Sequence, residues 1–211
     1  MSERSNRKLN ISYINNFSLT HVAIILGQSD QSSSNFVVPT EYSPDIHLIS
    51  QVMLNDKRIV NVITETLANA PPDLYITEPL PSFDKRVSNV FYIPPGPSNN
   101  IPYILISVVE SLEDMVFHHI LLRCIKIREM YHVSPICVII VAQEIDDDTM
   151  KMSSVYQELP FFRDVQSTFW AEKCLIVSAK DCRMNRSRLI NHPLLDIVFA
   201  ITSKSKLMII R

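Results

Sequence analysis

The strongest constraint on the fold is a strand–helix–strand pattern between Ile101 and Ile145. The run YILISVV is apolar at every position, which is typical of a strand buried on both faces. The segment from Glu113 to Tyr131 is mostly apolar and has the length of a helix, and PICVIIV is a second run of the buried type. Two buried strands joined by a helix predict a parallel pair with a right-handed crossover.

Weaker signals flank this unit on both sides. Ser43-Pro44-Asp45 has the N-cap residue, first-turn proline and acidic residue that begin helices. We therefore expect helices in SPDIHLISQVMLND and KRIVNVITETLANA, a short strand at 73–77, a strand in CLIVS and a last helix in PLLDIVFAITS. We interpret LPSFDKRVSN as a polar surface excursion. Strands that alternate with helices predict an α/β domain with a partly parallel sheet.

The chain length of 211 residues suits one domain preceded by a tail. We expect residues 1–42 to form a polar, partly flexible segment with one possible strand in VAIILG, and residues 43–211 to form the domain.

Composition excludes several classes of protein. The only glycines are Gly27 and Gly96, so the glycine-rich phosphate loops of dinucleotide-binding proteins and P-loop NTPases are absent. The net charge of −2 does not indicate a generally basic nucleic-acid binder. The four cysteines include no CxxC pair, which disfavours a zinc site or a disulfide scaffold. Without an N-terminal apolar run or a bilayer-length stretch, we expect a soluble intracellular protein with no membrane partner.

Several segments together resemble a known family. DIHLISQVMLNDKRIVNVITETL, PPDLYITE and ILISVVESLEDMVFHHILLRCIKIREMYHVSPICVIIV are similar to the opening helices, first site strand and strand–helix–strand core of PD-(D/E)XK nuclease-like proteins. The relevant members are recombination-promoting nucleases and transposase-related proteins, and FYIPPGPSNNIPY and TFWAEKCLIVS resemble their fungal expansions. The resemblance covers roughly residues 45–141, more loosely to 178. It implies a restriction-endonuclease-like fold, a mixed sheet flanked by helices. The strand of Asp73 and the runs YILISVV and PICVIIV would lie near the centre of this sheet.

The resemblance also implies a metal site, which this sequence matches only in part. In such proteins an Asp and a Glu on neighbouring strands hold Mg²⁺, and a Lys or Gln orients the attacking water. Asp73 matches the Asp, but the Glu position aligns with Ser107 and the Lys or Gln position with Val109. Neither Ser nor Val can do that chemistry. Glu110 lies three residues after Ser107, so strand alternation points its side chain to the opposite face. Only a bulge in the strand would bring it into the site.

Other carboxylates and cations have two readings each. Glu113 or Asp114 is an alternative second metal ligand, while Asp73 is also a typical turn residue. The run 146–148 after PICVIIV suits a helix cap better than a cation site. Two basic groups suit either phosphate contact or plain solvent exposure. One is the stripe of His119, Arg123 and Lys126 on the long helix. The other is the stretch with Lys173, Lys180, Arg183, Arg186 and Arg188, which is alternatively a plain surface loop.

Two functional hypotheses follow. The first is a nuclease-like protein derived from mobile-element or recombination nucleases, catalytically degenerate and DNA-binding. If its site were intact, Asp73 and Glu110 would bind Mg²⁺ and the protein would be a metal-dependent endodeoxyribonuclease. If it were not, the protein would be a pseudoenzyme with no cofactor. The alternative is a non-catalytic protein-interaction domain on the same scaffold.

Overall fold

The computed structural model describes residues 46–80, 84–96, 101–184 and 192–202. All of them lie in one compact unit, residues 44–204. The expected boundary at residue 42, the expected strand in VAIILG and the helix start signal at Ser43 lie outside the described residues.

A mixed sheet forms the centre of this unit. Its strands are β1 (Ile76–Pro79), β2 (Val87–Ile93), β3 (Ile104–Val109), β4 (Ile136–Val141), β5 (Ser153–Val155), β6 (Arg163–Val165) and β7 (Lys173–Ser178). The seven strands follow the order β1-β2-β3-β4-β7-β6-β5. The central strands β3, β4 and β7 are parallel, and the outer neighbours pair antiparallel. The predicted α/β class is confirmed, as is the parallel pairing of YILISVV with PICVIIV.

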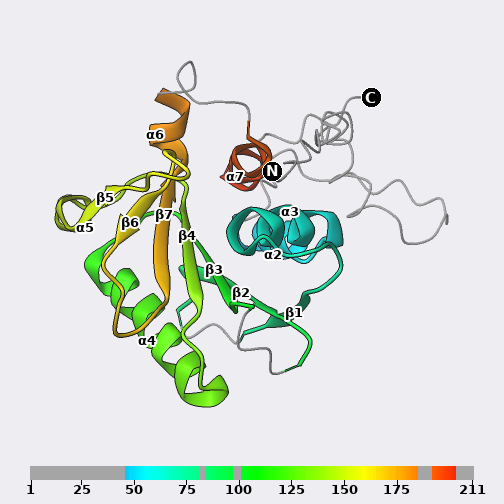
Figure 1. Cartoon of the computed structure of the whole chain (residues 1–211). Coiled ribbons are helices and arrows are strands. Elements are labelled where there is room, and N and C mark those ends of the chain that lie inside the picture. The colour runs from blue at the N-terminus through cyan, green and yellow to red at the C-terminus, as the bar shows by residue number, and fades with distance from the viewer. Residues whose placement is uncertain (1–45, 81–83, 97–100, 185–191, 203–211) are drawn as a thin grey trace, which may run out of the picture. The chain divides into compact units, whose positions relative to one another are not determined.

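Helices cover both faces of the sheet (Figure 1). They are α2 (Ile46–Leu54), α3 (Lys57–Ala68), α4 (Asp114–Tyr131), α5 (Asp147–Met152), α6 (Ala179–Met184) and α7 (Pro193–Thr202). The long helix α4 lies on one face, while α2, α3 and α7 lie together on the other. The six-residue strands β3 and β4 are buried at every position, as their apolar sequences predict.

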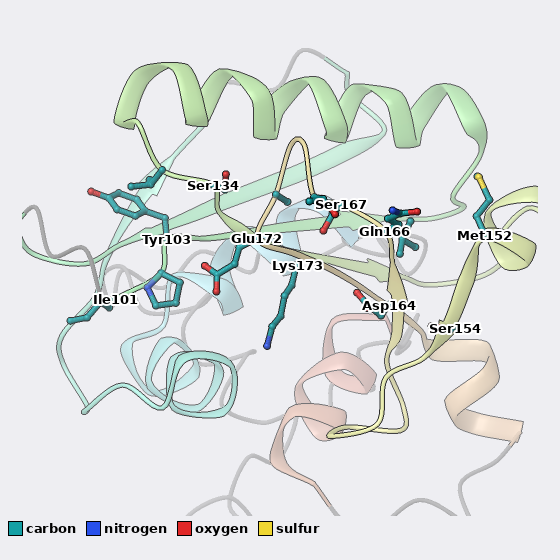
Figure 2. Close-up of a pocket in the computed structure, with 15 residues that line it drawn as sticks. Ile101, Tyr103, Ser134, Met152, Ser154, Asp164, Gln166, Ser167, Glu172 and Lys173 are labelled. Carbon is teal, nitrogen blue, oxygen red and sulfur yellow. The ribbon is translucent and has the colours of Figure 1, made fainter.

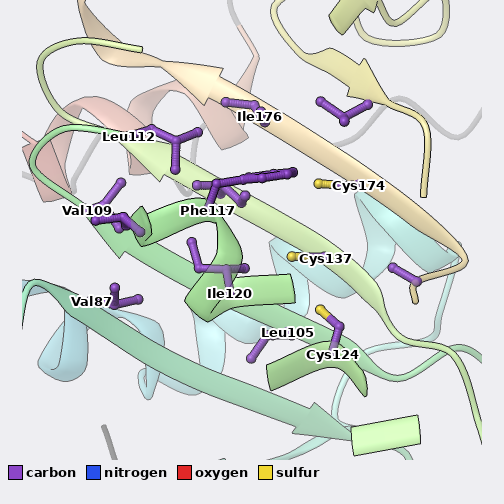
Figure 3. Packing of buried hydrophobic residues seen from close by; sticks show 14 of the residues in the cluster. Val87, Leu105, Val109, Leu112, Phe117, Ile120, Cys124, Cys137, Cys174 and Ile176 are labelled. Atoms are coloured by element: carbon purple, nitrogen blue, oxygen red, sulfur yellow. The ribbon is translucent and has the colours of Figure 1, made fainter. Parts of the chain in front are cut away.

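The core between α4 and the sheet contains three of the cysteines (Figure 3). Cys124 comes from α4, while Cys137 and Cys174 are register partners on β4 and β7. All three are fully buried and free. Burial raises the pKa of the Cys124 thiol well above its ordinary value. These cysteines therefore act as small apolar core residues, as their sequence context predicts.

Two sequence interpretations of the sheet are wrong. LPSFDKRVSN is not wholly a surface excursion, because β2 begins at Val87 and runs beside β3. The strand after Asp73 is not central, because β1 is an edge strand that pairs only with β2. The strands β5 and β6 were also not expected, since each has only three residues.

Candidate functional site

Asp73 occupies a turn before β1 and its side chain is exposed. Its φ of 64° lies in the left-handed region, which Asp adopts more readily than most residues. Asn61 donates a hydrogen bond to its carboxylate at 3.1 Å, and Lys57 forms an ion pair with it at 3.2 Å. These two contacts, in that order, hold the pKa of Asp73 below its ordinary value. The turn interpretation of Asp73 accounts for all of these contacts.

The structure does not bring Asp73 and Glu110 together. Ile76, three residues after Asp73, pairs with Ile93 of β2. The preceding residue of β2, Tyr92, pairs with the first residue of β3. Asp73 therefore lies beyond the N-terminal end of β3. Glu110 follows the last residue of β3. At ~3.3 Å per residue, the six residues of β3 separate its two ends by about 20 Å. Ligands of one Mg²⁺ must each lie about 2.1 Å from it, so these two carboxylates cannot share a metal in this arrangement.

The residue that faces Ser107 across the strand pair is Asn89 of β2. The two are register partners, and the Ser107 Oγ donates to the Asn89 Oδ1 at 2.7 Å. Both side chains are buried and lie on the face covered by α4. The position that the resemblance assigns to the metal-binding Glu therefore holds a neutral side chain, and the residue beside it on β2 is also neutral. The one local signal of this strand was the apolar run VFYI directly after Asn89. The polar residues before that run made the start of the strand resemble a surface segment.

Helix α2 holds this part of β2 from the opposite face. The Gln51 side-chain amide donates to the Ser88 Oγ at 2.8 Å and to the Asn89 carbonyl oxygen at 3.1 Å. The Ser88 hydroxyl and both carbonyl oxygens of Asn89 thus have protein partners, and these partners come from both faces of the sheet.

A charged cluster lies next to the Ser107–Asn89 pair, between the start of β2 and α4. Arg86 forms an ion pair with Asp84 at 2.8 Å, and the His119 Nδ1 lies 2.9 Å from the Asp84 carboxylate. The hydrogen bonds from Arg86 hold the pKa of Asp84 far below its ordinary value. Arg123 is buried beside this cluster, so the expected solvated stripe on α4 is wrong for that residue.

The space enclosed by this cluster is small. A cavity of about 10 Å³ lies between β2 and α4. A cavity of that size has room for about one water molecule. A metal ion together with a phosphate group does not fit there.

Glu110 lies at the C-terminal ends of the parallel strands and has a partner within the chain. The Gln143 side-chain amide donates a hydrogen bond to its carboxylate. The alternative ligands point elsewhere: Glu113 lies 3.7 Å from Arg86, and Asp114 contacts His118 at 3.2 Å, both with exposed side chains. No bulge turns Glu110 into the Ser107 position, because β2 and β3 pair without interruption from Val87 to Tyr92.

The acidic run after β4 begins helix α5. The Asp146 carboxylate accepts hydrogen bonds from the backbone N–H groups of Asp148 at 3.0 Å and Thr149 at 2.9 Å. This is the helix cap expected from the sequence. Within residues 46–80, 84–96, 101–184 and 192–202, no group of three or more His, Cys, Asp or Glu side chains is arranged to hold a metal ion. The described residues therefore do not fit the Mg²⁺ site that the resemblance implies.

The cations proposed for phosphate contact are only partly described. The Arg183 guanidinium donates to the Thr202 Oγ1 at 3.2 Å and so binds the end of α7. Arg183 belongs to helix α6, not to a loop. Arg186 and Arg188 lie outside the described residues.

Comparisons with protein-family models, with curated proteins and with solved structures found no match to this chain. Among the helices that the structure describes, none is both long and apolar enough to cross a bilayer.

Proposed function

We propose that this chain is a non-catalytic binding domain on a nuclease-like scaffold. The observation that carries the proposal is the hydrogen bond between Ser107 and Asn89. Ser107 stands where the resemblance requires the metal-binding Glu, and its hydroxyl donates instead to the neutral Asn89. The other carboxylate of the expected pair, Asp73, belongs to a turn at an edge strand.

The charges on the described surface favour a partner other than nucleic acid. Five of the twelve Lys and Arg residues in the described ranges already form ion pairs with carboxylates of the chain. The ion pairs are Lys57–Asp73, Arg58–Asp56, Arg86–Asp84, Lys151–Asp148 and Lys180–Glu144. Binding to DNA phosphates would have to compete with these contacts.

DNA binding is the second candidate, and one feature favours it. Lys180 and Arg183 lie on α6, directly before Arg186 and Arg188 in the sequence. If this segment binds DNA, the affinity must fall steeply as salt rises, because each neutralised phosphate releases counterions. A fluorescence anisotropy titration of labelled duplex DNA at increasing salt measures this directly. We expect no binding that responds to salt in this way.

A nuclease assay tests the proposal. Purified protein is incubated with single- and double-stranded DNA in Mg²⁺ or Mn²⁺, beside Asp73→Ala and Glu110→Ala and a known metal-dependent nuclease. We expect no cleavage by the parent chain or by either variant. Cleavage by the parent that both substitutions abolish would contradict the proposal, since it would mean that the two carboxylates meet in an active site.

A further inference from the structure

A pocket of about 830 Å³ lies at the end of the sheet opposite to Glu110. It is formed where β3, β4 and β7 begin, together with parts of β5 and β6. Ile101 and Tyr103 border one end and Met152 and Ser154 the other, with the charged residues between them (Figure 2). Its volume lies in the range of about 300–1,000 Å³ that is usual for small-molecule sites.

Two carboxylates that line this pocket form no hydrogen bond or ion pair with a described residue. Asp164 of β6 is half-buried, and the exposed Glu172 directly precedes β7. Neither side chain has a hydrogen bond or an ion pair with any other residue of the described ranges. Asp56, Asp84 and Asp148, in contrast, each pair with a cation. The two pocket carboxylates are therefore available to a cationic ligand.

One fixed cation lies beside them. The Lys173 Nζ donates to the Tyr156 hydroxyl at 3.1 Å and lies 5.5 Å from the centre of the tyrosine ring. The hydrogen bond to Tyr156 raises the pKa of Lys173, so the ammonium group keeps its charge. The pocket thus combines two negative charges with one positive charge.

The spacing of these charges leaves room for a ligand. Asp164 is the register partner of Leu175, so strand alternation places Asp164 and Lys173 on the same face as diagonal neighbours. Such neighbours lie roughly 7–8 Å apart. Asp164 and Lys173 form no ion pair. A ligand with groups of both signs can therefore bridge them.

The rest of the lining is mixed in character. Hydroxyl groups come from Ser134, Ser154 and Thr168, and Gln166 adds an amide. Ile101, Tyr103 and Met152 provide apolar surface at the two ends. Val165 and Ala171, next to Asp164 and Glu172 in the sequence, add apolar surface on which an aliphatic chain between charged groups can pack.

We propose that this pocket binds a dibasic amino acid such as lysine. Asp164 and Glu172 contact its two ammonium groups, Lys173 contacts its carboxylate, and its aliphatic chain lies on the apolar lining. The two negative charges and one positive charge of the pocket complement the two positive charges and one negative charge of this ligand. This inference rests on the proposed function, because it names a ligand for the proposed binding domain.

Isothermal titration calorimetry of the full chain at low ionic strength tests the ligand class. L-lysine is compared with cadaverine, which lacks the carboxylate, and with L-norleucine, which lacks the side-chain amine. We expect lysine to bind about tenfold or more tightly than either analogue, because each analogue leaves one charged group of the pocket without its partner. Absence of lysine binding, or equal binding of all three compounds, would overturn the inference.

Substitutions in the pocket test the roles of its charges. Asp164→Asn and Glu172→Gln keep the side-chain shape, and each should weaken lysine binding about tenfold. Lys173→Gln should remove the preference for lysine over cadaverine, a change that a general loss of structure would not produce. Asp148→Asn is the matched control, since this exposed carboxylate pairs with Lys151 away from the pocket lining. Its lysine affinity should equal that of the parent, and pocket variants that also bind like the parent would overturn the assignment.

Failure of this inference can be distinguished from failure of the proposed function. The pocket shares no residue with the Ser107–Asn89 pair. DNA cleavage that depends on Asp73 and Glu110 would overturn the proposed function. A chain that neither cleaves DNA nor binds lysine would overturn the lysine site alone.

Discussion

The two ends of the parallel strands β3, β4 and β7 differ in how their charged groups are satisfied. At the C-terminal end, Glu110 accepts from Gln143 and Glu144 pairs with Lys180 at 2.9 Å. At the N-terminal end, Asp164 and Glu172 form no hydrogen bond or ion pair with a described residue. Open α/β sheets usually bind ligands at the C-terminal ends of their strands. Among the described residues, the pocket and its two carboxylates lie at the other end, so position in the fold alone does not identify a site.

The largest expected effect comes from placing a carboxylate where the nuclease resemblance requires one. Ser107→Glu would bury a charge and extra volume between β3 and α4, beside a cavity of only about 10 Å³, and the nearby buried Arg123 already interacts within the chain. We expect the free energy of unfolding in urea to fall by about 3–5 kcal/mol, and Mg²⁺ not to restore it. A variant as stable as the parent, or one rescued by Mg²⁺, would show that the position can hold a metal ligand.

Ser107→Ala is the control for that substitution. It removes the hydrogen bond to Asn89 but adds neither charge nor volume. The remaining cost is a buried amide oxygen without its donor, about 1–3 kcal/mol in the same urea experiment. A loss equal to that of Ser107→Glu would mean that the added charge is not the cause of instability.

A smaller effect, dependent on pH, is expected at Asp84. Hydrogen bonds from Arg86 depress the pKa of this carboxyl in the folded state, so its contribution to stability is complete above the unfolded pKa of about 4 and is lost as the pH falls below it. We expect Asp84→Asn to cost about 1 kcal/mol near pH 7, allowing for the solvent screening of Arg86. Urea unfolding from pH 7 to pH 3 should show parent and variant converging below about pH 4. A difference that stays constant over this range would contradict the assignment.

The smallest effect is expected at Glu110. Its carboxylate is exposed and its partner is the neutral amide of Gln143. Glu110→Gln should therefore leave the urea midpoint unchanged within error, as surface substitutions usually do. A clear loss of stability, or a gain on removal of the charge, would indicate that Glu110 takes part in a charged site.

Much of the fold could be predicted from the sequence because its central elements have strong local patterns. The apolar runs of β3 and β4 and the length of α4 identify these elements without any tertiary information. Strand β2 was missed because Ser88 and Asn89 are polar yet buried, and their partners Gln51 and Ser107 come from distant parts of the chain. Local periodicity does not reveal such partners.

The candidate sites were less predictable than the fold. The position of Asp73 relative to β3 depends on which strands pair. Because β2 lies between β1 and β3, Asp73 lies near the edge of the sheet. The pocket around Asp164, Glu172 and Lys173 depends on the return of β6 alongside β7, which no short motif indicates. The only local signal was the pair Glu172-Lys173 directly before a buried strand.

The most direct test of the central claim is an amide NMR spectrum of the protein recorded during a titration with Mn²⁺, a paramagnetic substitute for Mg²⁺. We expect no saturable line broadening centred on the amides of Asn89, Ser107 and Glu110, because these residues form no metal site. Saturable broadening at these three residues, reversed by excess Mg²⁺, would contradict this expectation and show that the chain has a metal site there.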